Sequence, residues 1–197
     1  MQPGGRAPAP GELSLVQSFI NTHYDLEIEH GADLFATPRA LADWFAARGL
    51  IERTRAPSAR ECSSALAVRE TLREIARGNG PGSGAQDAGA AGEALYDRLG
   101  TAARGACVEV RLTSAGPRFH AIPAAGLTGA LGVVIAHAAS AMIDGSWARL
   151  KVCAGEGCGW AFYDHSRNQT GRWCSMSVCG GRAKARAHYK RLRDQVQ

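Results

Sequence analysis

Four of the six cysteines are spaced as metal ligands. Cys153 and Cys158 form one pair, Cys174 and Cys179 form another with the same internal gap, and 15 residues separate the two pairs. A structural zinc site needs four soft ligands in a tetrahedron, usually two from each of two tight turns. Two pairs at this separation are typical of zinc, although the usual gap within a pair is two residues. Disulfides and buried free thiols are the alternatives. We expect one structural Zn²⁺, because a module of about 50 residues cannot easily bury enough apolar surface to be stable without a metal ion or another cross-link.

The residues around the cysteines fit this interpretation. The glycines within Ala154–Gly157 suit a tight knuckle, and residues 160–163 predict a strand that shields the site. Ser175 is a predicted helix cap that places Cys179 in the first turns, where the helix dipole favours a thiolate. Knuckle, hairpin and helix in this order predict a treble-clef-like zinc finger.

Excess positive charge is confined to the C-terminal quarter of the chain. From residue 149 onward there are ten Lys and Arg against three acids, whereas the rest is slightly acidic. A basic module of this kind usually has a polyanionic partner. Residues 178–196 predict a helix whose apolar stripe could pack on the knuckle and leave two basic flanks free. A solvated helix that only aids solubility is the alternative. We expect DNA contacts from Arg167, Arg172, Arg182, Lys184, Arg186, Lys190, Arg191 and Arg193.

The preceding 146 residues predict an α+β domain, so the chain divides into residues 1–146 and 147–197. Residues 1–12 look like a frayed arm. A helix is expected over 13–20, where a short strand is the alternative. Further helices are expected from Thr37 to Gly49, from Ser58 onward with Glu61 as a capping box, and over 93–104 and 127–142. Residues 106–122 alternate as a β-hairpin.

Periodicity in the helix after Ser58 predicts which side chains are buried. Its apolar stripe consists of Ala65, Val68, Leu72 and Ile75. The charged residues between them are expected to face water; they are Arg69, Glu70, Arg73 and Glu74.

The motifs resemble a known pair of families. The segments Cys158–Asn168, Arg172–Met176 and Cys179–Lys184 are similar to the CGNR zinc finger. The N-terminal region is similar to the ABATE domain that precedes it, through Phe19–Thr22, Asp33–Pro38 and Val68–Leu72. The resemblance implies a bacterial transcription regulator, often stress-related, whose four cysteines bind zinc and whose basic finger binds DNA. Gly181 stands where the family signature has Asn.

No catalytic constellation is visible. The six histidines are scattered and no hydrolase, P-loop or dinucleotide motif occurs. A zinc ion with four thiolates has no open position for substrate. The acidic cluster around His23 (Asp25, Glu27, Glu29 and His30) is better explained as a solvated loop than as a metal site. We therefore expect a regulator rather than an enzyme.

Several weaker expectations complete the interpretation. Asn21, Trp44 and His120 are candidates to line an effector pocket in the first domain. A homodimer is compatible with DNA binding, because one finger reads few bases. The alternative function is a zinc-stabilised adaptor that binds protein or RNA.

Location and the remaining thiols are also predicted. Residues 130–143 form an apolar stretch too short for a bilayer, and no signal peptide is visible, so we expect a cytoplasmic protein with no membrane contact. Cys62 and Cys107 are expected to be buried free thiols.

Overall fold

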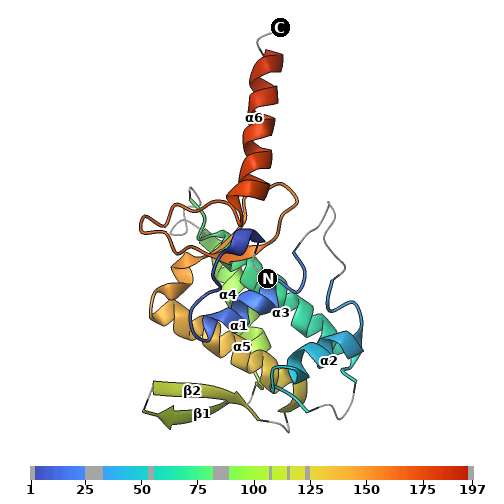
Figure 1. Ribbon diagram of the computed structural model, residues 1–197. Coiled ribbons are helices and arrows are strands. Elements are labelled where there is room, and N and C mark those ends of the chain that lie inside the picture. The colour runs from blue at the N-terminus through green and yellow to red at the C-terminus, as the bar shows by residue number, and fades with distance from the viewer. Residues whose placement is uncertain are drawn as a thin grey trace.

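The computed structural model describes residues 3–24, 33–52, 56–81, 89–106, 108–114, 116–122 and 125–194. It shows a helical body with a small hairpin at one end and a single projecting helix at the other (Figure 1). The architecture is α+β with a C-terminal cysteine cluster, as the sequence predicts.

In the described residues the body contains five helices: α1 (Leu13–Ile20), α2 (Pro38–Ala46), α3 (Ala59–Arg77), α4 (Gly89–Ala103) and α5 (Gly126–Ile143). The predicted start signals are confirmed. Thr37 caps α2 by accepting a hydrogen bond from the Ala40 N–H, and Pro38 is the first helical residue. Ser58 and Glu61 form the reciprocal capping box of α3. Such caps satisfy N–H groups that have no partner within the helix.

Two antiparallel hairpins complete the fold. β1 (Val108–Thr113) pairs with β2 (Gly116–Ala121), and β3 (Leu150–Val152) pairs with β4 (Ala161–Tyr163). Short helical turns lie at Pro3–Gly5 and Ser146–Arg149. A π-helical turn, Met176–Gly180, leads directly into α6 (Gly181–Asp194).

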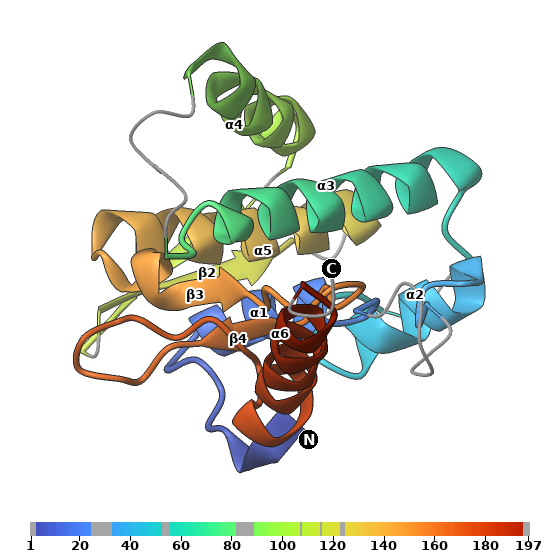
Figure 2. The ribbon, with the colours of Figure 1, turned by 90° about the horizontal axis from the view of Figure 1, so that it is seen from above.

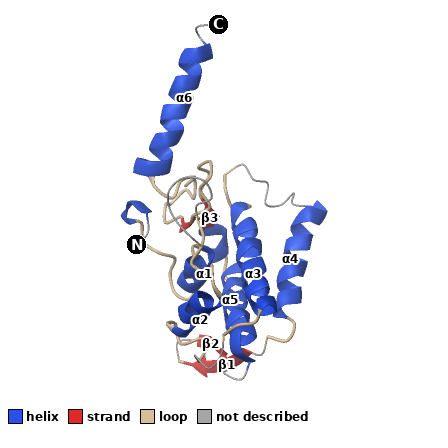
Figure 3. Ribbon diagram, turned by 90° about the vertical axis from the view of Figure 1, so that its right-hand side faces the viewer, coloured by secondary structure: helices blue, strands red, loops and turns tan. Residues whose placement is uncertain are grey.

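The main core lies where α1, α3 and α5 meet (Figures 2 and 3). Phe19, Phe45, Leu72 and Val134 are fully buried there. The helix α5 has 18 residues, slightly more than the 127–142 expected and more than the apolar stretch 130–143, and by length and composition it could cross a membrane. Here 56% of it is buried within the protein, as is usual for the central helix of a globular fold.

The β3–β4 hairpin separates the main core from a second, smaller one. Leu150, Ala161 and Tyr163 belong to the main core, whereas Phe162 belongs to the cysteine cluster. Alternate residues of a strand point to opposite faces, so one short strand serves both cores. The main core thus contains side chains from both sides of residue 146, and the division into two domains stays a prediction.

Residues 3–12 of the N-terminal arm lie against the finger and α1, so the expectation of a frayed arm was wrong for this part of it. Arg6 donates hydrogen bonds to the carbonyls of Cys174 and Trp173, at 3.3 and 3.1 Å, and its guanidinium lies over the Phe162 ring. Ala9 is buried, and its N–H donates to the Gln17 side chain at 2.7 Å. Composition alone could not place Arg6, because the Trp173 and Cys174 carbonyls to which it donates are 167 and 168 residues further along the chain.

Two arginines of α3 are buried, which corrects the expectation that they face water. Arg69 makes a two-point ion pair with Asp33, at 2.6 and 2.7 Å. Arg73 is only 1% exposed and pairs with Glu70 at 2.8 Å. Its guanidinium also donates to the carbonyls of Ile20, His23 and Gly159. Buried charges are tolerated when every donor has a partner, and all of these partners except Glu70 lie between 36 and 86 residues away in sequence.

Replacing Arg73 should therefore be severe. Arg73→Met removes the guanidinium that donates to three carbonyls, and it leaves Glu70 with Arg69 as its remaining arginine partner, so we expect the free energy of unfolding to fall by roughly 3–5 kcal/mol. Urea unfolding followed by circular dichroism measures it. Arg77→Met is the matched control, because Arg77 is half-exposed and its ion pair among the described residues is with Glu74, one turn away on the same helix. A loss for Arg73→Met as small as for Arg77→Met would contradict this role.

Candidate metal centre

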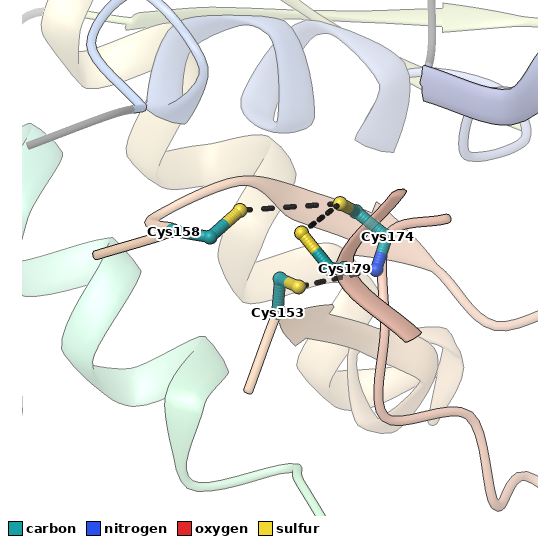
Figure 4. Close-up of side chains that lie close together, drawn as sticks. All are labelled: Cys153, Cys158, Cys174 and Cys179. Atoms are coloured by element: carbon teal, nitrogen blue, oxygen red, sulfur yellow. Dashed lines mark hydrogen bonds between the residues drawn. The ribbon is translucent and has the colours of Figure 1, made fainter. Parts of the chain in front are cut away.

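The four predicted cysteines converge on one point (Figure 4). Their Sγ atoms all lie within 4.8 Å of one another, with Cys158 to Cys174 at 3.9 Å and Cys174 to Cys179 at 3.6 Å. Four sulfurs at about 2.3 Å from a tetrahedral zinc are about 3.8 Å apart. The spacing of the thiols therefore fits a zinc ion, and at these distances no disulfide joins them.

The first pair lies on the turn between β3 and β4. Cys153 follows β3 directly, and its N–H extends the ladder by donating to the Trp160 carbonyl at 2.9 Å. Gly157 has a φ of 70°, a conformation that favours glycine. A Cβ on Gly155 would lie 3.2 Å from the Cys179 Sγ. The glycines thus allow the turn to fold tightly around the sulfurs.

Backbone amides polarise the cluster toward thiolate. The N–H groups of Gly155 and Cys174 donate to the Cys153 Sγ at 3.4 and 3.3 Å. Hydrogen bonds from the thiols of Cys158 and Cys174, with these amides, lower the pKa of Cys153 to about 2. Amide N–H groups directed at a sulfur are the usual support of a structural metal site.

The other three thiols resist ionisation next to that charge. The hydrogen bond between Cys158 and Cys153 raises the pKa of Cys158 to about 12. A hydrogen bond between Cys174 and Cys153 likewise raises the pKa of Cys174. Burial, reinforced by the charge on Cys153, raises the pKa of Cys179. Four thiolates can coexist here only around a divalent cation.

The second pair is positioned by the start of the C-terminal helical segment. The Ser175 hydroxyl accepts a hydrogen bond from the Val178 N–H at 3.3 Å, as predicted for a cap. The π-helical turn then carries Cys179 to the cluster and α6 begins at Gly181. Gly181 has ordinary helical angles, and a Cβ there would meet only the Met176 carbonyl oxygen, at 3.7 Å. This position therefore has room for a side chain.

A buried ion pair organises the loop between the two cysteine pairs. Lys151 and Asp164 are 2% and 1% exposed, and Lys151 Nζ lies 2.9 Å from Asp164 Oδ2. The carboxylate also accepts hydrogen bonds from the N–H groups of Ser166 and Gly171, at 3.0 and 2.7 Å. Burial alone would raise the pKa of Asp164, but the hydrogen bonds from Ser166 and Lys151 outweigh it and lower that pKa.

Sequence reasoning overlooked this pair, although a signal was present. An Asp two residues before a Ser is typical of a turn in which the carboxylate accepts from the backbone. A Cβ on Gly171 would lie 2.7 Å from the Asp164 carboxylate, which explains the glycine there. The ion pair thus holds the loop in which Arg167 is exposed.

The basic residues predicted for DNA contact lie on two exposed segments. Arg167 and Arg172 are on the loop, with Arg172 over the Trp173 ring. The other six are exposed on α6, where Arg186 pairs with Glu156 at 3.5 Å. They are Arg182, Lys184, Arg186, Lys190, Arg191 and Arg193.

The apolar stripe of α6 does not pack on the knuckle, which corrects that expectation. No residue of α6 is buried, and Tyr189 is 71% exposed. The helix begins at the cysteine cluster and projects away from the body (Figure 1). Because the direction of α6 is set by the turn that carries Cys179, its later residues cannot return to the knuckle. The aromatic residues Trp160, Phe162 and Trp173 cover the cluster instead.

The three effector-pocket candidates lie in different places. Asn21 is buried, and its side-chain amide pairs with both backbone groups of Ala161, at 2.7 and 2.8 Å. Trp44 packs against Phe19, Phe35 and Phe45. His120 is exposed on β2, beside a cavity of about 330 Å³ that His137 also lines. Asn21 and Trp44 therefore hold the fold together, and neither lines the cavity beside His120.

Two further expectations fall partly outside the described residues. Of the acidic cluster, only His23 is described, and its carbonyl accepts from Arg73. Cys107 is not described. Cys62 is a half-buried free thiol on α3, and burial, the largest cause, raises its pKa.

Fold and site together define a zinc-finger protein whose finger is built onto a helical domain. Comparison with known families agrees. Residues 13–146 match the ABATE family, described as "Putative stress-induced transcription regulator", and residues 149–192 match the CGNR zinc finger. The chain belongs to the ABATE family and carries a CGNR zinc finger after it. None of the curated proteins compared with the chain matches it. The matched families are regulatory and zinc-finger families, not enzyme families.

The metal can be tested directly. We expect one zinc per chain by elemental analysis, and loss of that zinc in Cys174→Ser, because three thiolates and a hydroxyl bind zinc more weakly. Cys62→Ser is the matched control and should keep the metal. Zinc should also be released as the pH falls, since protons compete for the thiolates. Retention of a full equivalent by Cys174→Ser would contradict the four-cysteine site.

The buried ion pair gives a second test. Asp164→Asn leaves the Lys151 ammonium buried without a counter-charge, so we expect the free energy of unfolding at neutral pH to fall by roughly 3 kcal/mol. Asp144→Asn is the control, because Asp144 is exposed and also accepts from a Ser N–H two residues on, at 2.8 Å. Chemical denaturation of the zinc-loaded protein measures both. Equal small losses would show that the pair contributes little.

Proposed function

We propose that this protein is a transcription regulator that binds duplex DNA through α6 and the 164–172 loop. The observation that carries the proposal is the exposure of α6, a 14-residue helix with six basic side chains and no buried residue. Only Asp194 opposes that charge within the described helix. Basic side chains on an exposed helix bind phosphates and release counterions, which gives affinity without sequence information.

The dimensions of the helix also suit a DNA groove. Fourteen residues extend about 21 Å, and an α-helix fits the major groove of B-DNA. The exposed apolar side chains Tyr189 and Leu192 lie on the same helix as the basic residues. Apolar contacts of this kind could reach thymine methyl groups. The order of knuckle, hairpin and helix supports a treble-clef-like finger as the platform.

A role for the N-terminal region in sensing a small molecule is supported by a groove between α3, α4 and α5. The groove has a volume of about 640 Å³, within the range of ligand sites. Its lining includes the buried side chains of Val68 and Leu131 and the exposed side chains of Arg60 and Arg98. We place the protein in the cytoplasm, where reduced thiols are available for zinc.

DNA binding is tested by fluorescence anisotropy with a labelled duplex at 50 and 200 mM salt. We expect affinity to fall by a factor of 10³ or more over that range if about six phosphates are contacted. The triple variant Arg182→Gln, Arg186→Gln and Lys190→Gln should weaken binding at least 100-fold and keep its zinc.

The matched control removes the same charge elsewhere. Arg60→Gln, Arg98→Gln and Arg104→Gln together change exposed arginines of α3, α4 and the turn that follows and should change affinity less than threefold. Unchanged binding by the α6 variant would reject α6 as the contact surface. A zinc-loaded protein that binds no duplex at low salt would reject DNA binding and favour the adaptor function.

A further inference from the structure

The outer edge of β1 is open. β1 pairs with β2 in a two-stranded sheet, and no other described strand lies beside it. In Figures 1 and 3 the hairpin lies at the margin of the molecule, at the opposite end from α6. An open edge carries unpaired N–H and C=O groups that can pair with another strand, and an isolated two-stranded ribbon is only marginally stable.

The apolar face of β1 extends beyond the helix that should cover it. Val108 is half-buried against α5, where a Cβ on Gly132 would lie 2.8 Å from the Val108 Cγ2. Further along the same face, Val110 is 55% exposed and Leu112 is 86% exposed. Large side chains exposed on one strand face in this way are typical of an interaction surface.

The other face of β1 carries one acid and one base. Glu109 and Arg111 form an exposed ion pair at 2.9 Å. On β2, Glu109 lies opposite His120 and Arg111 lies opposite Arg118. Arg111 therefore faces a like charge across the hairpin, which destabilises a strand pair.

We propose that β1 pairs with β1 of a second copy of this chain, antiparallel, about a two-fold axis at Val110. Paired residues in an antiparallel ladder share a face, so only registers that set apolar opposite apolar residues are allowed. Centring the axis on Glu109 opposes two glutamates, and centring it on Arg111 opposes two arginines. Centring it on Val110 sets each Glu109 opposite the Arg111 of the other copy.

The same register covers the exposed apolar side chains. It places Leu112 of each copy opposite Val108 of the other, beside the α5 that already contacts Val108 through Gly132. Two Val110 side chains meet at the axis. On the charged face, Glu109 of each copy then lies between Arg111 of the other copy and His120 of its own β2. A cross-strand pair of this kind, made twice by symmetry, fixes both the partner and the register.

This inference assigns the assembly role of the N-terminal region, and it does not depend on DNA binding. Its test therefore uses the full-length zinc-loaded protein without DNA, in sedimentation equilibrium over a range of protein concentrations. We expect a monomer–dimer equilibrium. Arg111→Glu should raise the dimer dissociation constant by on the order of 10- to 100-fold, because both cross-copy pairs become repulsive.

The exchanged variant is the decisive comparison. Glu109→Arg with Arg111→Glu restores opposite charges in the proposed register, so its dissociation constant should return to within about threefold of the wild-type value. Arg98→Glu, an equal charge change on an exposed face of α4, should leave dimerisation unchanged. Circular dichroism and zinc content check that each variant is folded.

Three results would overturn the inference. One is a wild-type protein that remains monomeric at the highest concentration. Another is a dimer that Arg111→Glu does not weaken, which would place the interface elsewhere. The third is an exchanged variant that stays as weak as Arg111→Glu, which would reject this register.

Discussion

Four sulfur atoms within 4.8 Å of one another can all be thiolates only around a divalent cation, and the C-terminal part of the fold depends on that constraint. The cation connects the turn after β3 to the segment that starts α6, across the loop held by Asp164. Neither piece has a large apolar core: Phe162 is the one fully buried aromatic residue among the described residues of this cluster. Metal coordination therefore supplies stability that a small module cannot obtain from burial alone.

The finger is attached to the helical body by buried polar contacts as well as by packing. Asn21 pairs with the backbone of Ala161 as a neighbouring strand would, and Gln17 donates to the same carbonyl at 3.1 Å. Arg73 reaches the carbonyl of Gly159, next to the ligand Cys158. Such contacts are directional, because a buried donor that loses its acceptor is strongly penalised. They fix the orientation of the finger on α1 and α3, and hence the direction in which α6 leaves the body.

Local signals in the sequence predicted local structure well. Thr37, Ser58 and Ser175 each lie three residues from the group that they cap, so the caps can be predicted from spacing. The cysteine ligands can be predicted from residue type and spacing. The errors all involve distant partners. The burial of Arg69 and Arg73 depends on Asp33 and on carbonyls up to 86 residues away. Helical periodicity could not predict this burial, because it assigns charged side chains to the exposed face. The docking of Arg6 and the direction of α6 likewise follow from tertiary contacts that no window of sequence contains.

The charge distribution on α6 is unfavourable for an isolated helix. Arg182 and Arg186, and Arg186 and Lys190, are like charges four residues apart, which lowers helix stability. Basic residues in the first turn also oppose the helix dipole, and a 14-residue helix is marginal in water. Zinc coordination by Cys179 fixes the start of the helix, and the ion pair of Arg186 with Glu156 at 3.5 Å offsets part of its charge. A polyanion along the helix would remove that repulsion, so binding and helix stability should increase together.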